Sequence, residues 1–368
     1  MSSIDQQVPV LKKIILYLLF GLLFFGSLYL ASSFLIPLAV AVLIALTLVP
    51  MCRWLEGKGL NRGSSSFLGI MVVLAFFIGV FLIVTYQISS LAENWDQTKE
   101  QITSTTEEVK SYMDRNGIST EWVSQKIEDI SKSSGSDVQK LLSTTFGSLG
   151  KFLLMLIYAY LLLFYRGKFK KFIQKLTPPE DTQETSKILE QISSIAQSYL
   201  FGKFLLIVIL SCLYGAGFMI IGIKYAFIVA IIAGVLSLIP YFGNMIGGGL
   251  AVLFALISNG SLNGVIGVFV VMTIAQLLEN YVLTPLIVGK KVDLNPFFTI
   301  MIVVLGGAVW DIPGMIVAVP YLGIIKILLD HTVSFKPYAY LIGDDSEDGD
   351  EEDSILSRAE HWVKEKVT

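Results

Sequence analysis

Polar and ionisable side chains near the end of a long apolar run are the residues that could do chemistry in this sequence. Glu279 follows residues 225–278, which contain no Asp, Glu, Lys or Arg, and Gln276 and Asn280 lie within about one helical turn of it. Ionisable groups inside a membrane segment are costly, so they are candidates for handling ions, protons or solutes. These three oxygen-bearing side chains could hold a monovalent cation or a proton. Alternatively, Glu279 is an interfacial carboxylate that pairs with a lysine of the 290–291 pair.

A proline and several glycines interrupt the same apolar run. The stretch 239–249 reads IPYFGNMIGGG, in which Gly243 and Gly247 have GxxxG spacing. Small residues at this spacing let membrane helices pack closely, which is one explanation. The alternative is a broken helix, in which Pro240 and Gly243 expose backbone carbonyls to a substrate and Asn244 adds a polar contact.

Asp311 is a second isolated carboxylate in an apolar region. It lies next to Trp310 and two residues before Pro313, at the expected tip of a hairpin. A carboxylate at the start of a helix accepts hydrogen bonds from unpaired backbone N–H groups, so capping is its expected role. A place in a transport pathway is the alternative.

Other kinds of chemistry are not indicated. His331 and His361 are isolated, and Cys52 and Cys212 form no CxxC pair, so we expect no metal site and no disulfide framework. P-loop, nucleophile-elbow and zincin patterns do not occur in the sequence, which argues against an ATP-driven pump and common hydrolases. We expect no cofactor and no enzyme, and no basic stripe indicates a nucleic-acid partner.

The composition indicates the environment of these residues. The chain has 368 residues, of which 54% are hydrophobic and 15% charged, against about 25% charged in soluble domains. Runs without charged residues at 14–52, 63–92 and 225–278 exceed the roughly 20 apolar residues that cross a bilayer. We therefore predict an all-α polytopic membrane protein with about eight membrane segments, some broken or re-entrant, plus a small helical extracytoplasmic segment.

Residues 1–90 are predicted to form an N-terminal membrane hairpin and a third span. Two apolar segments, 14–30 and 38–51, flank a break that contains Pro37, and the third span follows at 67–87. Basic residues lie on both sides of the hairpin, and the positive-inside rule therefore places its flanks in the cytoplasm.

The middle of the chain is predicted to leave the membrane and return. Residues 91–145 combine a heptad pattern with a net negative charge, which indicates an extracytoplasmic helical segment. A fourth span is expected at 146–165. A basic cytoplasmic loop and an amphipathic helix are expected at 166–203, and a capping box at 177–180 predicts where that helix begins. The basic residues of this loop are Arg166, Lys168, Lys170, Lys171 and Lys175.

The C-terminal membrane core is predicted at 204–335 and contains all the candidate residues described above. Its last segment, 296–329, is expected to fold into a hairpin at Trp310 and Asp311. Residues 336–368 form an acidic tail that we expect in the cytoplasm, as we do both termini.

Three blocks of the core resemble the signature blocks of the AI-2E (autoinducer-2 exporter-like) transporter family, also called PerM-type permeases. They read IPYFGNMIG at 239–247, QLLENYVLTPLIVGKKVDLNP at 276–296 and GGAVWDIPGMIVAVP at 306–320. The resemblance covers about residues 10–335, and it implies a bacterial inner-membrane permease. Members of this family are linked to export of autoinducer-2, a small hydroxylated signal, or to exchange of sodium or lithium for protons.

The resemblance also marks positions that match the family motifs. These are Pro240, Tyr241, Phe242, Gly243, Glu279, Asn280, Tyr281, Pro285, Gly289, Trp310, Asp311, Pro313 and Gly314. We therefore expect a transport pathway or ion-coupling site among Asn244, Gln276, Glu279, Asn280, Tyr281 and Asp311. Helix breaks or gates are expected at Pro240, Tyr241, Phe242, Gly243, Gly247, Pro285, Pro313 and Gly314.

The expected partners follow from the two activities linked to the family, solute export and cation/proton exchange. They are the lipid bilayer, a small solute or a monovalent cation or proton, and further copies of the chain, since heptad-patterned helices can pair. A non-transporting oligomeric membrane scaffold is the remaining alternative.

Overall fold

The protein is a bundle of helices in the part of the chain that the structure describes. The computed structural model describes residues 4–93, 149–178, 182–239, 242–259, 262–287 and 294–344, together with the single residues 100 and 115. Six of its helices are long and apolar enough to cross a membrane: Ser32–Gly57, Arg62–Leu82, Leu149–Leu176, Thr182–Ile221, Asn263–Ile287 and Pro296–Asp330. Shorter apolar helices accompany them. The prediction of an all-α polytopic membrane protein is confirmed.

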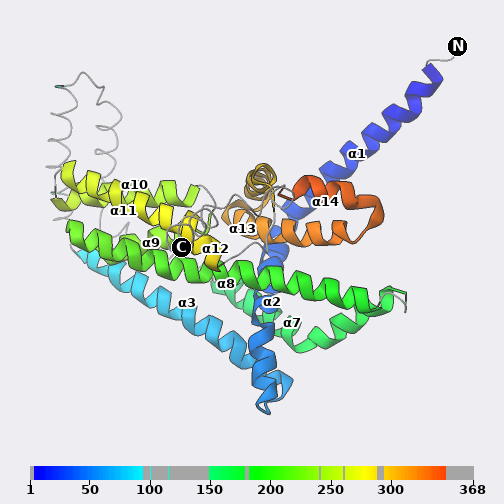
Figure 1. Cartoon of the computed structure of the whole chain (residues 1–368), viewed down its shortest axis with the longest axis horizontal. Helices are drawn as coiled ribbons and strands as arrows, with labels where there is room; N and C mark the ends of the chain where they lie inside the picture. The colour runs from blue at the N-terminus through cyan, green and yellow to red at the C-terminus, as the bar shows by residue number, and fades with distance from the viewer. Residues whose placement is uncertain are drawn as a thin grey trace, which may run out of the picture.

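The predicted N-terminal hairpin is wrong. Helix α1 (Ile4–Leu30) leads into α2 (Ser32–Gly57) through Ala31, and α1 points away from the bundle instead of folding back along α2 (Figure 1). A hydrogen bond of 2.9 Å from the Leu35 N–H to the Ala31 carbonyl carries the helical pattern through the junction. Pro37 lies inside α2, where it removes one helical hydrogen bond without ending the helix.

Helices α2, α3 (Arg62–Glu93) and α7 (Leu149–Leu176) share an apolar core. Ala41 of α2 and Ala159 of α7 are fully buried there, because small side chains let helices approach closely. Helix α3 runs past the predicted end of the third span. The extracytoplasmic segment predicted at 91–145 lies outside the described residues, apart from its first three and two single positions.

The predicted loop and separate amphipathic helix at 166–203 are also wrong. Helix α7 continues through the basic residues to Leu176, and α8 (Thr182–Ile221) joins the amphipathic helix and the following span without a break at Lys203. The Thr177 hydroxyl donates to the Gln174 carbonyl at the end of α7. The second half of the predicted capping box, 179–180, lies outside the described residues. The 40 residues of α8 extend over about 60 Å at 1.5 Å per residue, well beyond a hydrocarbon core of about 30 Å.

A helix break interrupts the long neutral run, as predicted. Helix α9 (Ala226–Leu236) has 11 residues and is too short to cross a bilayer alone. The chain then turns into α10 (Phe242–Asn259), and α11 (Leu262–Leu278) follows after another short turn. Pro240 and Tyr241 lie outside the described residues.

Helix α8 is the central element of the arrangement. It lies between the N-terminal helices α2, α3 and α7 and the C-terminal helices α10 to α13 (Figure 1). Tyr214 and Phe218 of α8 are fully buried against Ala230 of α9 and Val268 of α11. This packing positions the end of α11 against the middle of α8.

The C-terminal helices contain two departures from regular α-helix. A π-helical stretch, η2 (Glu279–Leu283), follows α11 and leads into α12 (Thr284–Ile287). Helix α13 (Pro296–Asp330) is two helices joined at a kink, where Trp310 and Asp311 have non-helical backbone angles.

The kink in α13 confirms the predicted hairpin at these residues. A β-carbon on Gly306 would lie 2.5 Å from the Gly314 carbonyl oxygen, so glycines permit the two arms to touch. The chain continues through η4 (Val333–Phe335) and α14 (Lys336–Ile342). The acidic tail from residue 345 onward lies outside the described residues.

Candidate functional site

Four of the predicted polar residues form one hydrogen-bonded network between α10 and the end of α11. The Asn244 amide donates to the side-chain oxygen of Gln276. The Gln276 amide in turn donates to Asn280 Oδ1 at 3.1 Å and to Glu279 Oε2 at 3.4 Å. Residues 276, 279 and 280 share one helix face because they are three and four positions apart. We call Asn244, Gln276, Glu279 and Asn280 the polar network.

Glu279 is the buried member of the polar network. Its side chain is only 6% exposed, and a buried carboxylate requires compensating polar groups. Lys203 and Tyr214 of α8 both interact electrostatically with it. The Tyr214 hydroxyl is buried and has no hydrogen-bond partner among the described residues. The lysines at 290–291, which were the alternative partners, lie outside the described residues.

The sequence interpretation missed Lys203 and Tyr214. The sequence pattern predicts only that Lys203 ends an amphipathic helix, and Tyr214 is one of several aromatic residues in an apolar segment. The available signal was the lysine itself, because it is an ionisable residue followed directly by an apolar run. Its approach to Glu279 depends on how α8 packs on α11.

The π-helical stretch begins at Glu279 and determines where the following residues point. The Thr284 N–H bonds to the Glu279 carbonyl, five residues back, which widens the helix by one residue in this turn. Such π-bulges frequently occur at functional sites. Tyr281 beyond Glu279 is 77% exposed, and Pro285 is also exposed, so neither joins the polar network.

A groove of about 650 Å³ lies beside the polar network, between α10 and α11. Asn244 and Gln276 contribute polar groups to a wall that is otherwise mostly apolar, with Val252, Phe269 and Met272 among its residues. Asn244 Oδ1 is buried without a hydrogen-bond partner among the described residues, so it is an unused acceptor. The arrangement could bind a small molecule that has both hydroxyl groups and an apolar part.

The glycines of the first block permit close helix packing. A β-carbon on Gly243 would collide with the carbonyl oxygen of Leu236, and one on Gly247 would lie 3.0 Å from Ala233. Close packing and a helix break, the two explanations given for this block, therefore both describe part of it. The helix breaks before Phe242, and the glycines pack against α9.

Asp311 lies apart from the hydrogen bonds of the polar network. It is exposed, has a φ of 52°, and its carboxylate makes no hydrogen bond or ion pair with another described residue. The predicted helix cap is therefore not formed. Pro313 and Gly314 follow it in the second arm of the hairpin. Its neighbour Trp310 instead donates from Nε1 to the carbonyl of Leu28 in α1, at 2.9 Å.

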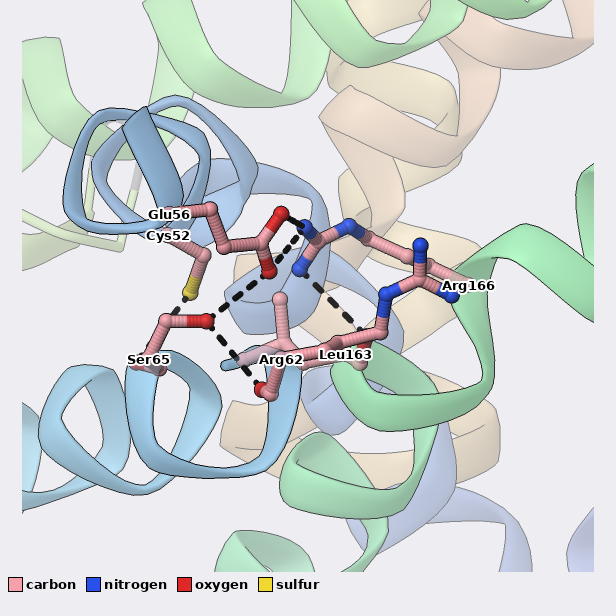
Figure 2. Close-up of polar contacts among 6 residues, drawn as sticks. All are labelled: Cys52, Glu56, Arg62, Ser65, Leu163 and Arg166. Atoms are coloured by element: carbon pink, nitrogen blue, oxygen red, sulfur yellow. Dashed lines mark hydrogen bonds and ion pairs between the residues drawn. The ribbon is translucent and has the colours of Figure 1, made fainter. Parts of the chain in front are cut away.

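A second charged group, which sequence interpretation did not identify, joins α2, α3 and α7. Arg166 Nη2 contacts both carboxylate oxygens of Glu56 at 2.5 Å, and the Ser65 hydroxyl donates to Glu56 at 2.9 Å. Figure 2 shows the Arg62 side chain reaching toward α7 beside this ion pair. The available signal was Glu56 itself, because it is a single carboxylate among basic residues that otherwise indicate only the membrane topology.

The described residues contain no group of three or more His, Cys, Asp and Glu side chains that could hold a metal ion. The polar network has one carboxylate and three amides, which suits hydrogen bonding or a hard monovalent cation better than a transition metal.

Comparison with known proteins adds the family context. A family model described as "AI-2E family transporter" matches residues 18–334. YrrI of Bacillus subtilis, named as a transport protein, is 28% identical over 320 residues, which are 82% of this chain and 87% of the relative. YueF of the same organism, also named as a transport protein, is 25% identical over 80% of this chain and 83% of its own. PerM of Escherichia coli K12, named as a permease, is 23% identical over 83% of this chain and 89% of its own.

Proposed function

This chain belongs to the AI-2E family of transporters, and from that premise we propose that it is a secondary transporter of a small polar solute with Glu279 as its coupling site. The observation that carries the proposal is the burial of Glu279 in a network of amides at the end of an apolar helix. Ionisable groups in such positions mark substrate or ion routes.

The network supplies two kinds of interaction. Asn244, Gln276 and Asn280 can exchange hydrogen bonds with solute hydroxyl groups, and the Asn244 oxygen is a free acceptor among the described contacts. Glu279 can accept a proton or hold a cation. The Gln276 amide donates a hydrogen bond to this carboxylate, and Lys203 interacts with it electrostatically. A proton or cation arriving at Glu279 therefore changes how strongly the carboxylate holds these neighbours, which is the basis for coupling.

The proposed substrate is a small hydroxylated solute such as autoinducer-2, moved outward. Its support is the family description together with the mixed polar and apolar lining of the groove between α10 and α11. A hydroxylated solute needs several hydrogen-bonding groups, which the three amides supply.

Exchange of sodium or lithium for protons is the second candidate. It is favoured by the same buried carboxylate, because a monovalent cation requires a negative charge and oxygen ligands. In this case the amide oxygens near Glu279 complete the cation site, and no organic solute is moved.

We further propose that the protein resides in a bacterial cytoplasmic membrane as a homo-oligomer. The basic residues that follow the apolar part of α7 support a cytoplasmic location for that end of the helix. In the same scheme both termini are cytoplasmic. Labelling of single cysteines at Lys12 and Lys336 with a membrane-impermeant thiol reagent, from each side of sealed vesicles, tests this orientation.

Transport assays on everted vesicles test the coupling site. Wild type, Glu279→Gln, Glu279→Asp and the exposed control Glu190→Gln are compared at equal protein level, for sodium-dependent proton movement and for accumulation of autoinducer-2. If Glu279 couples solute transport to the proton gradient, we expect wild type to accumulate autoinducer-2. Glu279→Gln should uncouple this accumulation from the proton gradient, and Glu279→Asp should retain part of it. Sodium-dependent proton movement that Glu279→Gln abolishes supports the antiporter instead. If the wild-type protein shows neither activity, the non-transporting scaffold is favoured.

A further inference from the structure

A large cavity opens among α2, α7 and α8, away from the polar network. Its volume is about 1050 Å³. Helices α7 and α8 approach each other where α7 ends and α8 begins and diverge from there, and α2 packs against both of them (Figure 1). The cavity lies where the apolar half of α7 changes into its basic half, a position that corresponds to the membrane interface.

The lining of this cavity is divided by polarity. Apolar side chains of α2 and α7, such as Val42, Leu46 and Leu162, form one part of its wall. Ser193 and Gln197 of α8 add uncharged polar groups. An amphipathic ligand is therefore a better match than a purely polar one.

The charged residues of the cavity carry an excess of positive charge. They are Arg53, Glu56, Arg62, Arg166, Lys170 and Glu190. Glu56 is already bound by Arg166 and by the Ser65 hydroxyl. Among the described residues, Arg53, Arg62 and Lys170 make no ion pair within 4 Å, so their charges are available to an anion.

A glycine leaves the space that lets Arg62 lie close to the cavity wall. A β-carbon on residue 167 would lie 2.8 Å from Arg62 Nη1, so Gly167 lets this guanidinium lie directly against α7. Figure 2 shows it beside the Arg166 side chain, which is itself bound to Glu56. Two guanidinium groups thus face the same region. Arg166 forms the ion pair with Glu56, whereas Arg62 interacts with Glu56 electrostatically without an ion pair within 4 Å.

We propose that this cavity binds an anionic phospholipid. Arg53, Arg62 and Lys170 hold its phosphate, and its acyl chains lie along the apolar wall of α2 and α7. Basic pockets between membrane helices bind the head groups of anionic lipids. A free phosphate ion would use the cations but not the apolar wall, which is why the lipid is the occupant that fits the whole cavity. The proposal does not depend on which solute the protein transports.

Lipid binding to the purified full-length protein tests this assignment. The protein in nonionic detergent is titrated with dioleoylphosphatidylglycerol, or with dioleoylphosphatidylcholine as the zwitterionic control, and retained lipid is counted by native mass spectrometry. The test variant is Arg53→Gln, Arg62→Gln and Lys170→Gln combined. The matched control is Lys168→Gln, Lys171→Gln and Lys175→Gln combined, which removes the same charge from positions of α7 outside the cavity lining.

We expect the wild type to retain phosphatidylglycerol in preference to phosphatidylcholine. The test variant loses three basic side chains worth about 1 kcal/mol each near an anionic lipid, so its apparent affinity falls roughly 100-fold. The control variant stays within about threefold of wild type. Equal retention by test and control variants overturns the proposal, as does equal binding of the two lipids by wild type.

A second variant distinguishes binding of a lipid from binding of a free anion, and its thermal unfolding temperature checks that it is folded. Val42→Trp fills the apolar part of the cavity without altering its charge. We expect it to weaken phosphatidylglycerol binding while leaving the thermal unfolding temperature of the lipid-free protein close to that of wild type. Two results together would overturn the lipid proposal and assign the cavity to a free anion. Inorganic phosphate would have to stabilise the protein as much as phosphatidylglycerol does, and Val42→Trp would have to leave this stabilisation unchanged.

Discussion

The side-chain amide of Asn244 in α10 donates a hydrogen bond to the side-chain oxygen of Gln276 in α11. This bond leaves the Gln276 amide hydrogens directed at Asn280 and Glu279. The first turn after the helix break is thereby connected to the buried carboxylate at the start of the π-helical stretch. A movement of α10 relative to α11 would change the hydrogen bonding of Glu279, which is the property that a coupled transporter needs.

Replacing Asn244 by leucine tests this connection. The variant Asn244→Leu removes the donor that orients Gln276 and keeps a side chain of similar size. We expect the transport rate in vesicles to fall about tenfold, equivalent to about 1.4 kcal/mol. Thermal unfolding should change little, because hydrogen bonds between membrane helices contribute about 0.6 kcal/mol on average. Met245→Leu, at an exposed neighbouring position, is the control. Wild-type transport by Asn244→Leu would remove Asn244 from the pathway.

The Glu56–Arg166 ion pair should contribute measurably to stability. Its side chains are only 26% and 16% exposed, and Arg166 contacts both carboxylate oxygens. A double-mutant cycle of Glu56→Gln and Arg166→Met, followed by chemical unfolding in detergent, should give a coupling energy of about 1.5 to 3 kcal/mol. The control is Glu190→Gln, which replaces an exposed carboxylate in the lining of the cavity among α2, α7 and α8. It should change the free energy of unfolding by less than about 0.5 kcal/mol. Strictly additive effects of the two substitutions would contradict this prediction.

Gly243 should tolerate no side chain. A β-carbon there would collide with the carbonyl oxygen of Leu236, a backbone atom that cannot move away without displacing α9. We expect Gly243→Ala to destabilise the protein by about 2 to 3 kcal/mol, measured by thermal unfolding in detergent. Gly249→Ala in the same helix meets nothing within 4 Å and serves as the control. Equal stability of the two variants would show that α9 and α10 do not need this close contact.

Trp310 should hold α1 against the C-terminal hairpin. Its Nε1 donates to the Leu28 carbonyl at 2.9 Å, and much of the rest of α1 is exposed. Trp310→Phe removes the donor and keeps an aromatic ring, at a cost of about 1 kcal/mol. We expect hydrogen exchange of the amides near Leu28 to become about fivefold faster. Trp54→Phe, an exposed tryptophan in α2, should leave that exchange unchanged, and unchanged exchange in Trp310→Phe would exclude the proposed attachment.

The local features of this protein could be predicted from its sequence. Long neutral runs predict membrane helices because only internally hydrogen-bonded segments are stable in lipid. The clustering of Gln276, Glu279 and Asn280 follows from helical periodicity. The breaks near Gly243 and at Trp310 follow from proline and glycine, whose backbone preferences are local properties.

Features that depend on packing between distant segments could not be predicted in this way. The N-terminal hairpin was wrong because Pro37 does not by itself end a helix whose hydrogen bonds can continue around it. Lys203 approaches Glu279 only because α8 continues unbroken through the predicted boundary and packs on α11. Glu56 and Arg166 are 110 residues apart in the chain. A sequence pattern determines which side chains share one helix face, but the tertiary structure decides which faces meet, because that choice depends on the packing of all the helices together.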